Sequence, residues 1–318
     1  MTAAPAARTQ AGPWRDVDGI VLLDKPEGLT SNAALQRVRR SFRARKAGHT
    51  GSLDPLASGL LPICLGQATK ASGLLLDADK TYGVRVVFGA RTTTGDREGE
   101  IAETAPVPTL SAEFLRGVTS SFIGESTQVP PMYSALKHQG ERLYRLARKG
   151  VEVERPPRSI TICRLDILEI GTDWVTLEVV CSKGTYVRSL AEDLARGCGT
   201  VGHVASLRRL ALGPFTSAQM HTLDAIEQSA MTGCGPESML LPADQALTAY
   251  PAVQLGIAEQ AAVLQGRTVP AVGPGASRVR MYGVGGRFLG IGRMSAEGAR
   301  VAPERIMVEV SNQPQQRA

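Results

Sequence analysis

The sequence of 318 residues has few aromatic side chains, 4% of the chain, and no long apolar run. A transmembrane helix needs roughly 18 consecutive apolar residues, which no stretch approaches. The start of the chain also lacks the apolar block of about 7 to 15 residues that a secretory signal requires. These absences exclude a membrane role and lead us to expect a cytoplasmic protein, with residues 1–16 as a disordered tail.

Cysteine is scarce as well, with five residues spread from Cys64 to Cys234. Their number is odd, and none forms a C-x-x-C pair or lies near a histidine at ligand spacing, so we expect neither a disulfide framework nor a metal site. The loop G-x-x-x-x-G-K-[ST] is absent, which excludes the common nucleotide triphosphatases. Residues 197–202 match G-x-G-x-x-G, but a helix is expected before them instead of a strand, so we interpret them as the end of that helix.

Positive charge is what the chain has in excess, with 36 Lys and Arg against 30 Asp and Glu and a pI of about 9.2. Residues 37–46 contain six basic side chains and no acid. A second Arg-rich cluster, residues 137–158, is diluted by three glutamates. Solvated charged faces and nucleic-acid binding both account for such clusters, and the charge alone leaves both open.

The first part of the chain predicts a buried strand followed by a basic helix. Residues 19–26 are a short apolar run closed by a proline, as is typical of a buried strand leading into a turn. Ser31 can then cap a helix over residues 32–46. Arginines occupy the other faces of this helix, and one face is apolar at Leu35, Val38 and Phe42.

Strands and helices continue without a repeating β-α-β rhythm. Residues 82–88 have the period-two pattern of a half-buried strand, and strand character returns at residues 176–181. Val187, Leu190 and Leu194 then indicate an amphipathic helix. The fold class predicted is therefore α+β with a mixed sheet.

The end of the chain has a different texture. Residues 236–251 look like a junction, and from residue 253 onward short apolar runs are cut by glycines, as in a small β-barrel. We predict a separate C-terminal module over residues 250–312, with residues 311–318 as a disordered end.

One carboxylate, Asp54, lies in the stretch GHTGSLDPLASG just after the first basic cluster. An Asp followed by Pro55 commonly begins a helix, here at Leu56. The flanking glycines would also let a ligand approach the backbone closely, in which case the carboxylate could act as a nucleophile or base. By default Tyr82 is a core strand residue, Arg188 a surface arginine and His49 a loop histidine, and their spacing alone does not link them.

The same stretch, extended to GHTGSLDPLASGLLPICLGQATK, closely resembles the active-site motif of bacterial tRNA pseudouridine-55 synthases of the TruB type. GIVLLDKPEGLTSN before it, and VPPMYSALKHQGERLYRLARKGVEV, CSKGTYVRSLAEDL and GHVASLRRL after it, match in order. The resemblance implies a pseudouridine-synthase domain over residues 17–245, with an RNA-gripping insertion at about 130–158. It also implies that the C-terminal module is a PUA-like RNA-binding domain.

The resemblance implies catalytic roles for three residues. Asp54 corresponds to the family's nucleophile, Tyr82 to the tyrosine that stacks on the base and acts in proton removal from C5, and Arg188 to the arginine that pairs with the nucleophile. An opposite charge lowers the pKa of an acid, so Arg188 would keep Asp54 ionised. Isomerising uridine involves no net redox change, and no metal or cofactor is expected.

Further residues are assigned to tRNA by the same resemblance. His49 would hold the RNA with its uridine flipped out, and Leu207 would close the pocket against the base. Four more positions match family residues near the active site: Lys25, Lys70, Asp96 and Tyr186. The residues expected at T-arm phosphates are Arg37, Arg40, Arg43, Lys46, Lys137, Arg142, Arg148 and Lys149.

Two alternatives remain beside a tRNA isomerase. One is a pseudouridine synthase guided by a separate RNA, although the bacterial-type motifs favour a chain that acts as a monomer without an obligatory protein partner. The other is an RNA-binding folding factor that opens and re-anneals tRNA, with modification secondary. The set Asp54, Tyr82 and Arg188 argues for catalysis, because a pure binder would not need it.

Overall fold

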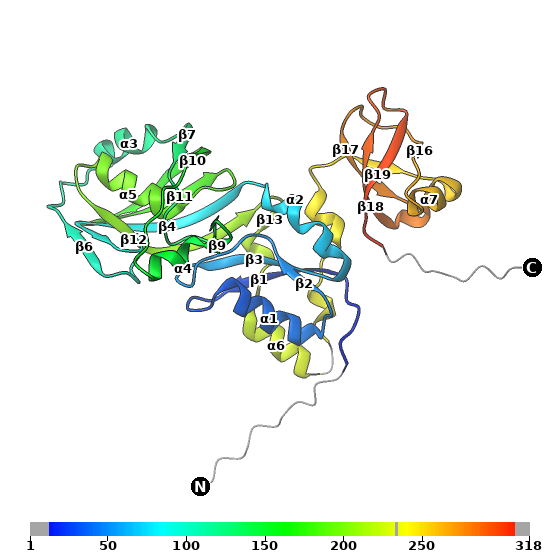
Figure 1. The fold of residues 1–318 in the computed structure, drawn as a ribbon, viewed down its shortest axis with the longest axis horizontal. Helices are drawn as coiled ribbons and strands as arrows, with labels where there is room; N and C mark the ends of the chain where they lie inside the picture. The colour runs from blue at the N-terminus through cyan, green and yellow to red at the C-terminus, as the bar shows by residue number, and fades with distance from the viewer. Residues whose placement is uncertain (1–12, 233–234, 309–318) are drawn as a thin grey trace, which may run out of the picture.

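A computed structural model describes residues 13–232 and 235–308 (Figure 1). Most of the predicted tail, Cys234 and the predicted disordered end at residues 311–318 lie outside the described residues. Residues 13–16 were expected in the tail, but Arg15 forms a parallel β-bridge with Ala44 and its N–H donates to the Arg43 carbonyl at 2.6 Å. Arg15 therefore belongs to the folded body, so the tail prediction is wrong at this residue.

A mixed sheet of ten strands forms the larger, N-terminal domain, which confirms the predicted α+β class. Two short strands are side branches: β2 (Ala47–His49) pairs with β3, and β13 (Phe215–Thr216) pairs with β12. The main strands follow the order β14 (His221–Thr222), β1 (Gly19–Lys25), β3 (Ser58–Leu65), β12 (Gly202–Leu212), β4 (Lys80–Phe88), β11 (Trp174–Cys181), β10 (Arg158–Ile170) and β7 (Gly124–Gln128).

The sheet has two halves that meet at one short parallel contact between β3 and β12. Only two residue pairs make this contact, Arg208 with Ser58 and Arg209 with Gly59. Gly59 has a φ of +98°, and a Cβ there would lie 2.3 Å from the Arg209 carbonyl oxygen. Glycine therefore permits the strands to meet, and the candidate site lies beside this junction.

β1 is buried on both faces, which accounts for its continuous apolar run. Val21 and Leu23 face the main core, which is shared with helices α1 (Ser31–Phe42), α5 (Val187–Gly197), α3 (Ala112–Ser120) and α6 (Leu223–Met231). Ile20 and Leu22 face a second core that includes α2 (Ser72–Leu76) and part of the C-terminal module.

α1 begins and ends differently from the prediction. Its cap is Thr30, whose hydroxyl accepts from the Ala33 N–H at 3.1 Å, whereas Ser31 is buried. The helix ends at Phe42 because Arg43 adopts the left-handed conformation, with φ at 50°, and so turns the chain toward β2. The predicted cap and the predicted end at residue 46 are wrong, while the predicted apolar face is buried as expected.

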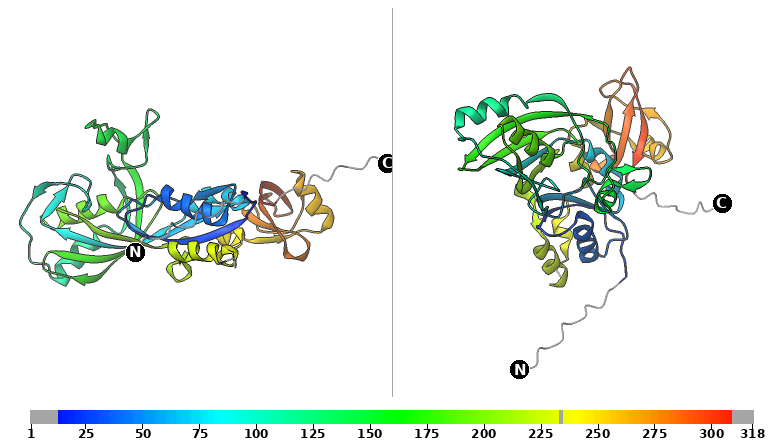
Figure 2. Two further views of the ribbon diagram at one scale, coloured as in Figure 1. Left: turned by 90° about the horizontal axis from the view of Figure 1, so that it is seen from below. Right: turned by 60° about the vertical axis from the view of Figure 1, so that its left-hand side comes forward.

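The predicted insertion lies between β7 and β10. It contains a two-stranded hairpin, β8 (Lys137–His138) and β9 (Glu141–Arg142), and the short helix α4 (Leu143–Arg148). The left view of Figure 2 shows this segment projecting from the rest of the molecule. A separate hairpin, β5 (Ala90–Thr92) and β6 (Ile101–Thr104), follows β4.

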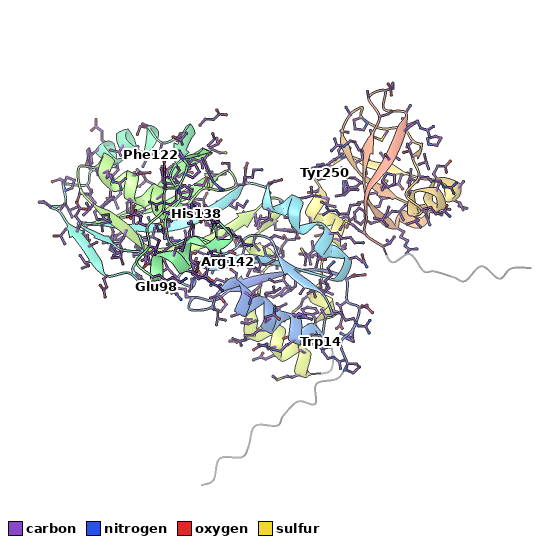
Figure 3. The ribbon with its side chains drawn as sticks, viewed as in Figure 1. Trp14, Glu98, Phe122, His138, Arg142 and Tyr250 are labelled. Carbon is purple, nitrogen blue, oxygen red and sulfur yellow. The ribbon has the colours of Figure 1, made fainter. Side chains whose placement is uncertain are left out.

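The C-terminal module has its own core and a five-stranded sheet (Figure 1). Tyr250, labelled in Figure 3, lies at the junction and joins the second core of the N-terminal domain, together with Ile291 and Met307 of the module. Helix α7 (Ile257–Leu264) accompanies the sheet, whose strand order is β15 (Ala252–Gln254), β17 (Arg278–Tyr282), β18 (Phe288–Met294), β19 (Arg300–Ile306) and β16 (Val269–Pro270).

Candidate active site

The loop between β2 and β3 carries Asp54, and hydrogen bonds fix it on both sides of that residue. The buried Ser31 hydroxyl donates to the Leu53 carbonyl at 2.9 Å and accepts from the Leu53 N–H at 2.7 Å. On the other side, the Gly28 N–H donates to the Pro55 carbonyl at 2.8 Å. Both neighbours of Asp54 are therefore held in place.

No helix begins at Asp54, so that interpretation is wrong. Its carbonyl accepts from the Ala57 N–H at 3.1 Å and closes a turn, after which β3 begins at Ser58. Pro55 follows Asp54 in this turn, where its fixed φ is favoured. The Asp54 carboxylate is thus left for contacts outside the local backbone.

Arg188, at the start of α5, pairs with that carboxylate. Its Nη2 lies 2.8 Å from Asp54 Oδ2, and its Nη1 lies 3.5 Å from Asp96 Oδ2. The same guanidinium donates to the carbonyls of Thr94, at 2.9 Å, and Tyr133, at 2.6 Å. The arginine side chain is 7% exposed, whereas the Asp54 side chain is 43% exposed. Arg188 is therefore locked behind a carboxylate that opens outward.

Asp96 reaches the site through Arg188. Its side chain is buried, and its Oδ1 accepts from the Thr94 hydroxyl at 2.6 Å and from the Glu98 N–H at 3.1 Å. These bonds fix the turn after β5 and aim Oδ2 at the guanidinium. Two carboxylates thus share one cation, and only Asp54 faces solvent.

A pocket of about 260 Å³ opens in front of Asp54. Tyr82 of β4, 9% exposed, and Leu207 of β12 lie on its walls, as does Tyr186. The sequence did not predict that Ser134 and Ala135, at the start of the insertion, would line the pocket as well. The complete lining is Ser52, Leu53, Asp54, Tyr82, Ser134, Ala135, Thr185, Tyr186, Val187, Arg188 and Leu207.

The pKa of Asp54 lies above its ordinary value. Burial is the main cause, because it disfavours the charged carboxylate, and the negative charge of Asp96 adds to the rise. Arg188 and Lys25 oppose the rise, but burial is the larger effect. The surroundings therefore hold an acid that gives up its proton at a higher pH than a free aspartate and then keeps a cation beside it.

Lys25 is fully buried and does not line the pocket. Its Nζ donates to the carbonyls of Pro26 and Leu29, each at 2.8 Å, and of Pro55 at 3.4 Å. Burial lowers its pKa to about 8. Because it is buried, this ammonium group cannot contact a substrate. It instead holds the turn that follows Asp54.

Two other predicted substrate residues, His49 and Lys70, also lie away from the pocket lining. His49 is half-buried in β2, and burial together with the Arg209 charge lowers its pKa, so the imidazole is neutral at pH 7. Lys70 donates to the Ile306 carbonyl at 2.7 Å, while Arg305 donates to the Lys70 carbonyl at 2.6 Å. The structure thus places Lys70 at the contact with the C-terminal module.

The predicted phosphate contacts fall into two groups. Arg37 is neutralised by Glu227, with Nε and Nη2 at 2.7 Å and 2.6 Å from its two oxygens, and Lys149 lies 2.7 Å from Glu141. The other members of the predicted set are exposed: Arg40, Arg43, Lys46, Lys137, Arg142 and Arg148. His138 and Arg142 of the insertion are labelled in Figure 3.

Two residues that matter to the site were missed. Ser31 was expected to cap α1 but instead fixes Leu53. Arg209 is 1% exposed and donates from Nε to the Leu60 carbonyl at 2.7 Å. The alternation of β12 could have indicated it, because Arg209 stands two residues after Leu207 and so on the same face of a regular strand.

Comparison with family models covers most of the chain. Residues 39–187 match the TruB family pseudouridylate synthase N-terminal domain. Residues 188–248 match the tRNA pseudouridylate synthase B C-terminal domain, and residues 251–307 match the C-terminal domain of pseudouridine synthase II TruB. Each of the matched regions thus corresponds to a domain of pseudouridine synthases. The pocket lined by Asp54, Tyr82 and Arg188 lies in this chain.

The similar proteins agree with the family models. The chain is 50% identical over 300 residues to tRNA pseudouridine synthase B of Nitrosococcus oceani, covering 93% of this chain and 97% of that one. It is 49% identical over 296 residues to the same enzyme of Stutzerimonas stutzeri, covering 92% and 96%. The chain therefore belongs to the TruB family, and it is a tRNA pseudouridine synthase, an isomerase.

Solved structures share the fold at greater sequence distance. A chain in the crystal structure of a Cbf5–Nop10–Gar1 complex aligns with a TM-score of 0.72 and 25% identity, covering 91% of this chain and 85% of that one. A chain of an H/ACA ribonucleoprotein bound to a substrate RNA aligns with a TM-score of 0.71 and 22% identity, which bears on the fold alone. The described part of the chain holds no helix long and apolar enough to cross a membrane.

Proposed function

We propose that this enzyme isomerises the uridine at position 55, in the T loop of tRNAs, with Asp54 as its nucleophile. The observation that carries the proposal is the Asp54 carboxylate, paired with Arg188 at 2.8 Å and open to a pocket of about 260 Å³. A base that is stacked inside the folded RNA cannot reach such a pocket, so the uridine is flipped out of the RNA.

Each residue then has a defined part in the reaction. Asp54 serves the breaking of the bond from the ribose to N1 of the base, by attack on the ribose or the base or by assisting a glycal intermediate, three routes that share the same starting geometry. Arg188 compensates the carboxylate charge, and Asp96 holds Arg188. Leu207 closes over the base while it turns and rejoins the ribose through C5.

Tyr82 also lines the pocket, where it stacks on the base and takes part in removing the C5 proton. Burial raises the pKa of the phenol, and the positive charge of Arg209 opposes that rise. No redox change occurs, since one carbon–hydrogen bond and one carbon–nitrogen bond are exchanged for a carbon–carbon bond and a nitrogen–hydrogen bond. The reaction thus requires neither metal nor cofactor.

The tRNA approaches along the exposed basic side chains of α1 and the insertion, with the enzyme as a cytoplasmic monomer. The runner-up is a tRNA folding factor in which isomerisation is secondary, favoured by the same basic surfaces. An RNA-guided synthase is less favoured, because identity is near 50% with the bacterial enzymes and 25% with the matched chain of the Cbf5–Nop10–Gar1 complex.

The test is to incubate an unmodified tRNA transcript with the purified chain alone, without guide RNA, partner protein or added cofactor, and to map pseudouridine by nucleotide. We expect product at a single uridine of the T loop. Binding of tRNA without product would favour the tRNA folding factor. Product that appears only with an added guide RNA would favour an RNA-guided synthase.

A further inference from the structure

Arg209 on β12 carries a buried charge whose contacts are unusual for an arginine. It is 1% exposed, and its guanidinium donates from Nε to the Leu60 carbonyl at 2.7 Å and from Nη2 to the Gly51 carbonyl at 3.3 Å. Over residues 13–232 and 235–308 it makes no ion pair. A buried charge without an opposite charge is costly. The two hydrogen bonds use only two of the five N–H donors of the guanidinium, so they compensate only part of that cost.

The position of Arg209 in the sheet brings it to the pocket from behind. Its Cα is paired with Tyr82 of β4 on one side and with Gly59 of β3 on the other. β3 begins four residues after Asp54, and the bare Gly59 lets β12 approach it closely. Arg209 thus stands between the strand that carries the tyrosine and the strand that leads from the nucleophile.

Three site groups lie around this one guanidinium. Gly51, whose carbonyl it holds, belongs to the loop that carries Asp54. Tyr82 is its cross-strand partner on β4, and the cation opposes the rise that burial causes in the pKa of Tyr82. The same charge helps burial to lower the pKa of His49. A planar guanidinium can hold several acceptors at fixed angles, which an ammonium group cannot.

We propose that Arg209 is a positioning residue of the uridine pocket, which fixes the Asp54 loop through the Gly51 carbonyl and orients the Tyr82 hydroxyl from behind. This inference rests on the proposed function. The positive charge beside the phenol favours its ionised form, in which the oxygen can accept the C5 proton and becomes neutral as the carbon–hydrogen bond breaks.

The test measures tritium release from a tRNA transcript labelled at C5 of uridine, with enzyme in excess so that one turnover is observed. Arg209→Met should lower the first-order rate by roughly 100-fold, as expected for misplaced reacting groups, while tRNA affinity changes little. The matched control is Lys80→Met. Lys80 is also buried on backbone carbonyls, those of Leu76 at 2.7 Å and Ala78 at 2.6 Å, and it lies outside the pocket lining.

A double variant separates positioning from a general loss of structure. If Arg209 acts through Tyr82, Arg209→Met should cost at least about tenfold less in a Tyr82→Phe background than in the wild type. Full independence of the two losses, or a loss equal to that of Lys80→Met, would overturn the inference.

Arg209→Lys keeps the charge and covers the case in which the methionine variant does not fold. It should remain folded and still lose rate, because one ammonium cannot reach the Gly51 and Leu60 carbonyls and the phenol together. Wild-type rate in this variant would also overturn the inference. Absence of tritium release by the wild type, by contrast, would overturn the proposed function.

Discussion

Two arginines beside the pocket are buried, but the groups that surround their guanidinium groups differ. On the α5 side, Arg188 faces two carboxylates, Asp54 at 2.8 Å and Asp96 at 3.5 Å. On the β12 side, Arg209 has backbone carbonyls and a phenol around it. Under the proposed mechanism, the carboxylates lie where charge moves during the reaction, and the uncharged acceptors lie where the geometry has to stay fixed.

α1 repeats the contrast at the surface, where Arg37 is neutralised by Glu227 and Arg40 is exposed. Under the proposed function, an exposed arginine such as Arg40 keeps its whole charge for an incoming phosphate, whereas the neutralised Arg37 joins two helices. α1 and α6 are joined in this second way.

The largest effect is expected from removing the cation of the α5 wall. Arg188→Met leaves two carboxylates close together without compensation, so the single-turnover rate should fall by about 10³-fold, the scale of losing a main electrostatic group. Arg188→Lys should recover part of the rate, because it restores charge without the fork that reaches both acids. A methionine variant with near wild-type rate would place the carboxylate chemistry elsewhere.

Asp96→Asn tests the same pair of carboxylates through the pH dependence of the single-turnover rate. Asp96 raises the pKa of Asp54, so its neutralisation should lower that pKa and move the acid limb of the rate profile to lower pH. At high pH the rate should be lower than wild type by about tenfold, since Arg188 loses one charged contact. An acid limb that stays in place, or moves to higher pH, would show that Asp54 ionisation does not govern the profile.

The smallest effects are expected on α1. Arg40→Glu should weaken tRNA binding and reduce the slope of log affinity against log salt by roughly 0.7 to 0.9, the value of one phosphate contact. Arg37→Gln is the matched control, which should lower the midpoint of urea unfolding through loss of the Glu227 pair and leave the salt slope nearly unchanged. Equal slopes for both variants would remove the contrast between exposed and neutralised arginines.

Much of the scaffold could be predicted because its signals are local. The alternation of β4 and the apolar face of α5 depend on burial of one side of a regular element, and both are found as expected. The end of α1 could not be predicted, because an arginine adopts the left-handed conformation there without a glycine to announce it. Tertiary contacts decide such a position.

The site could be predicted only through family resemblance, since Asp54, Tyr82 and Arg188 come from three distant segments. Sequence spacing gave no link among them, and it favoured a helix cap for Asp54. The burial of Lys25 was also hidden, because its carbonyl partners are backbone atoms that every residue has. Backbone acceptors leave no trace in composition or motif.

The most direct test of the whole account compares the wild type with Asp54→Asn, which nearly preserves side-chain shape and removes the charge. Pseudouridine formation in a tRNA transcript and tRNA affinity would be measured on the same preparations. The account predicts no product from the variant, with affinity within a few fold of wild type. Product at a rate near that of the wild type would contradict Asp54 as the nucleophile, and loss of binding would make it a structural residue.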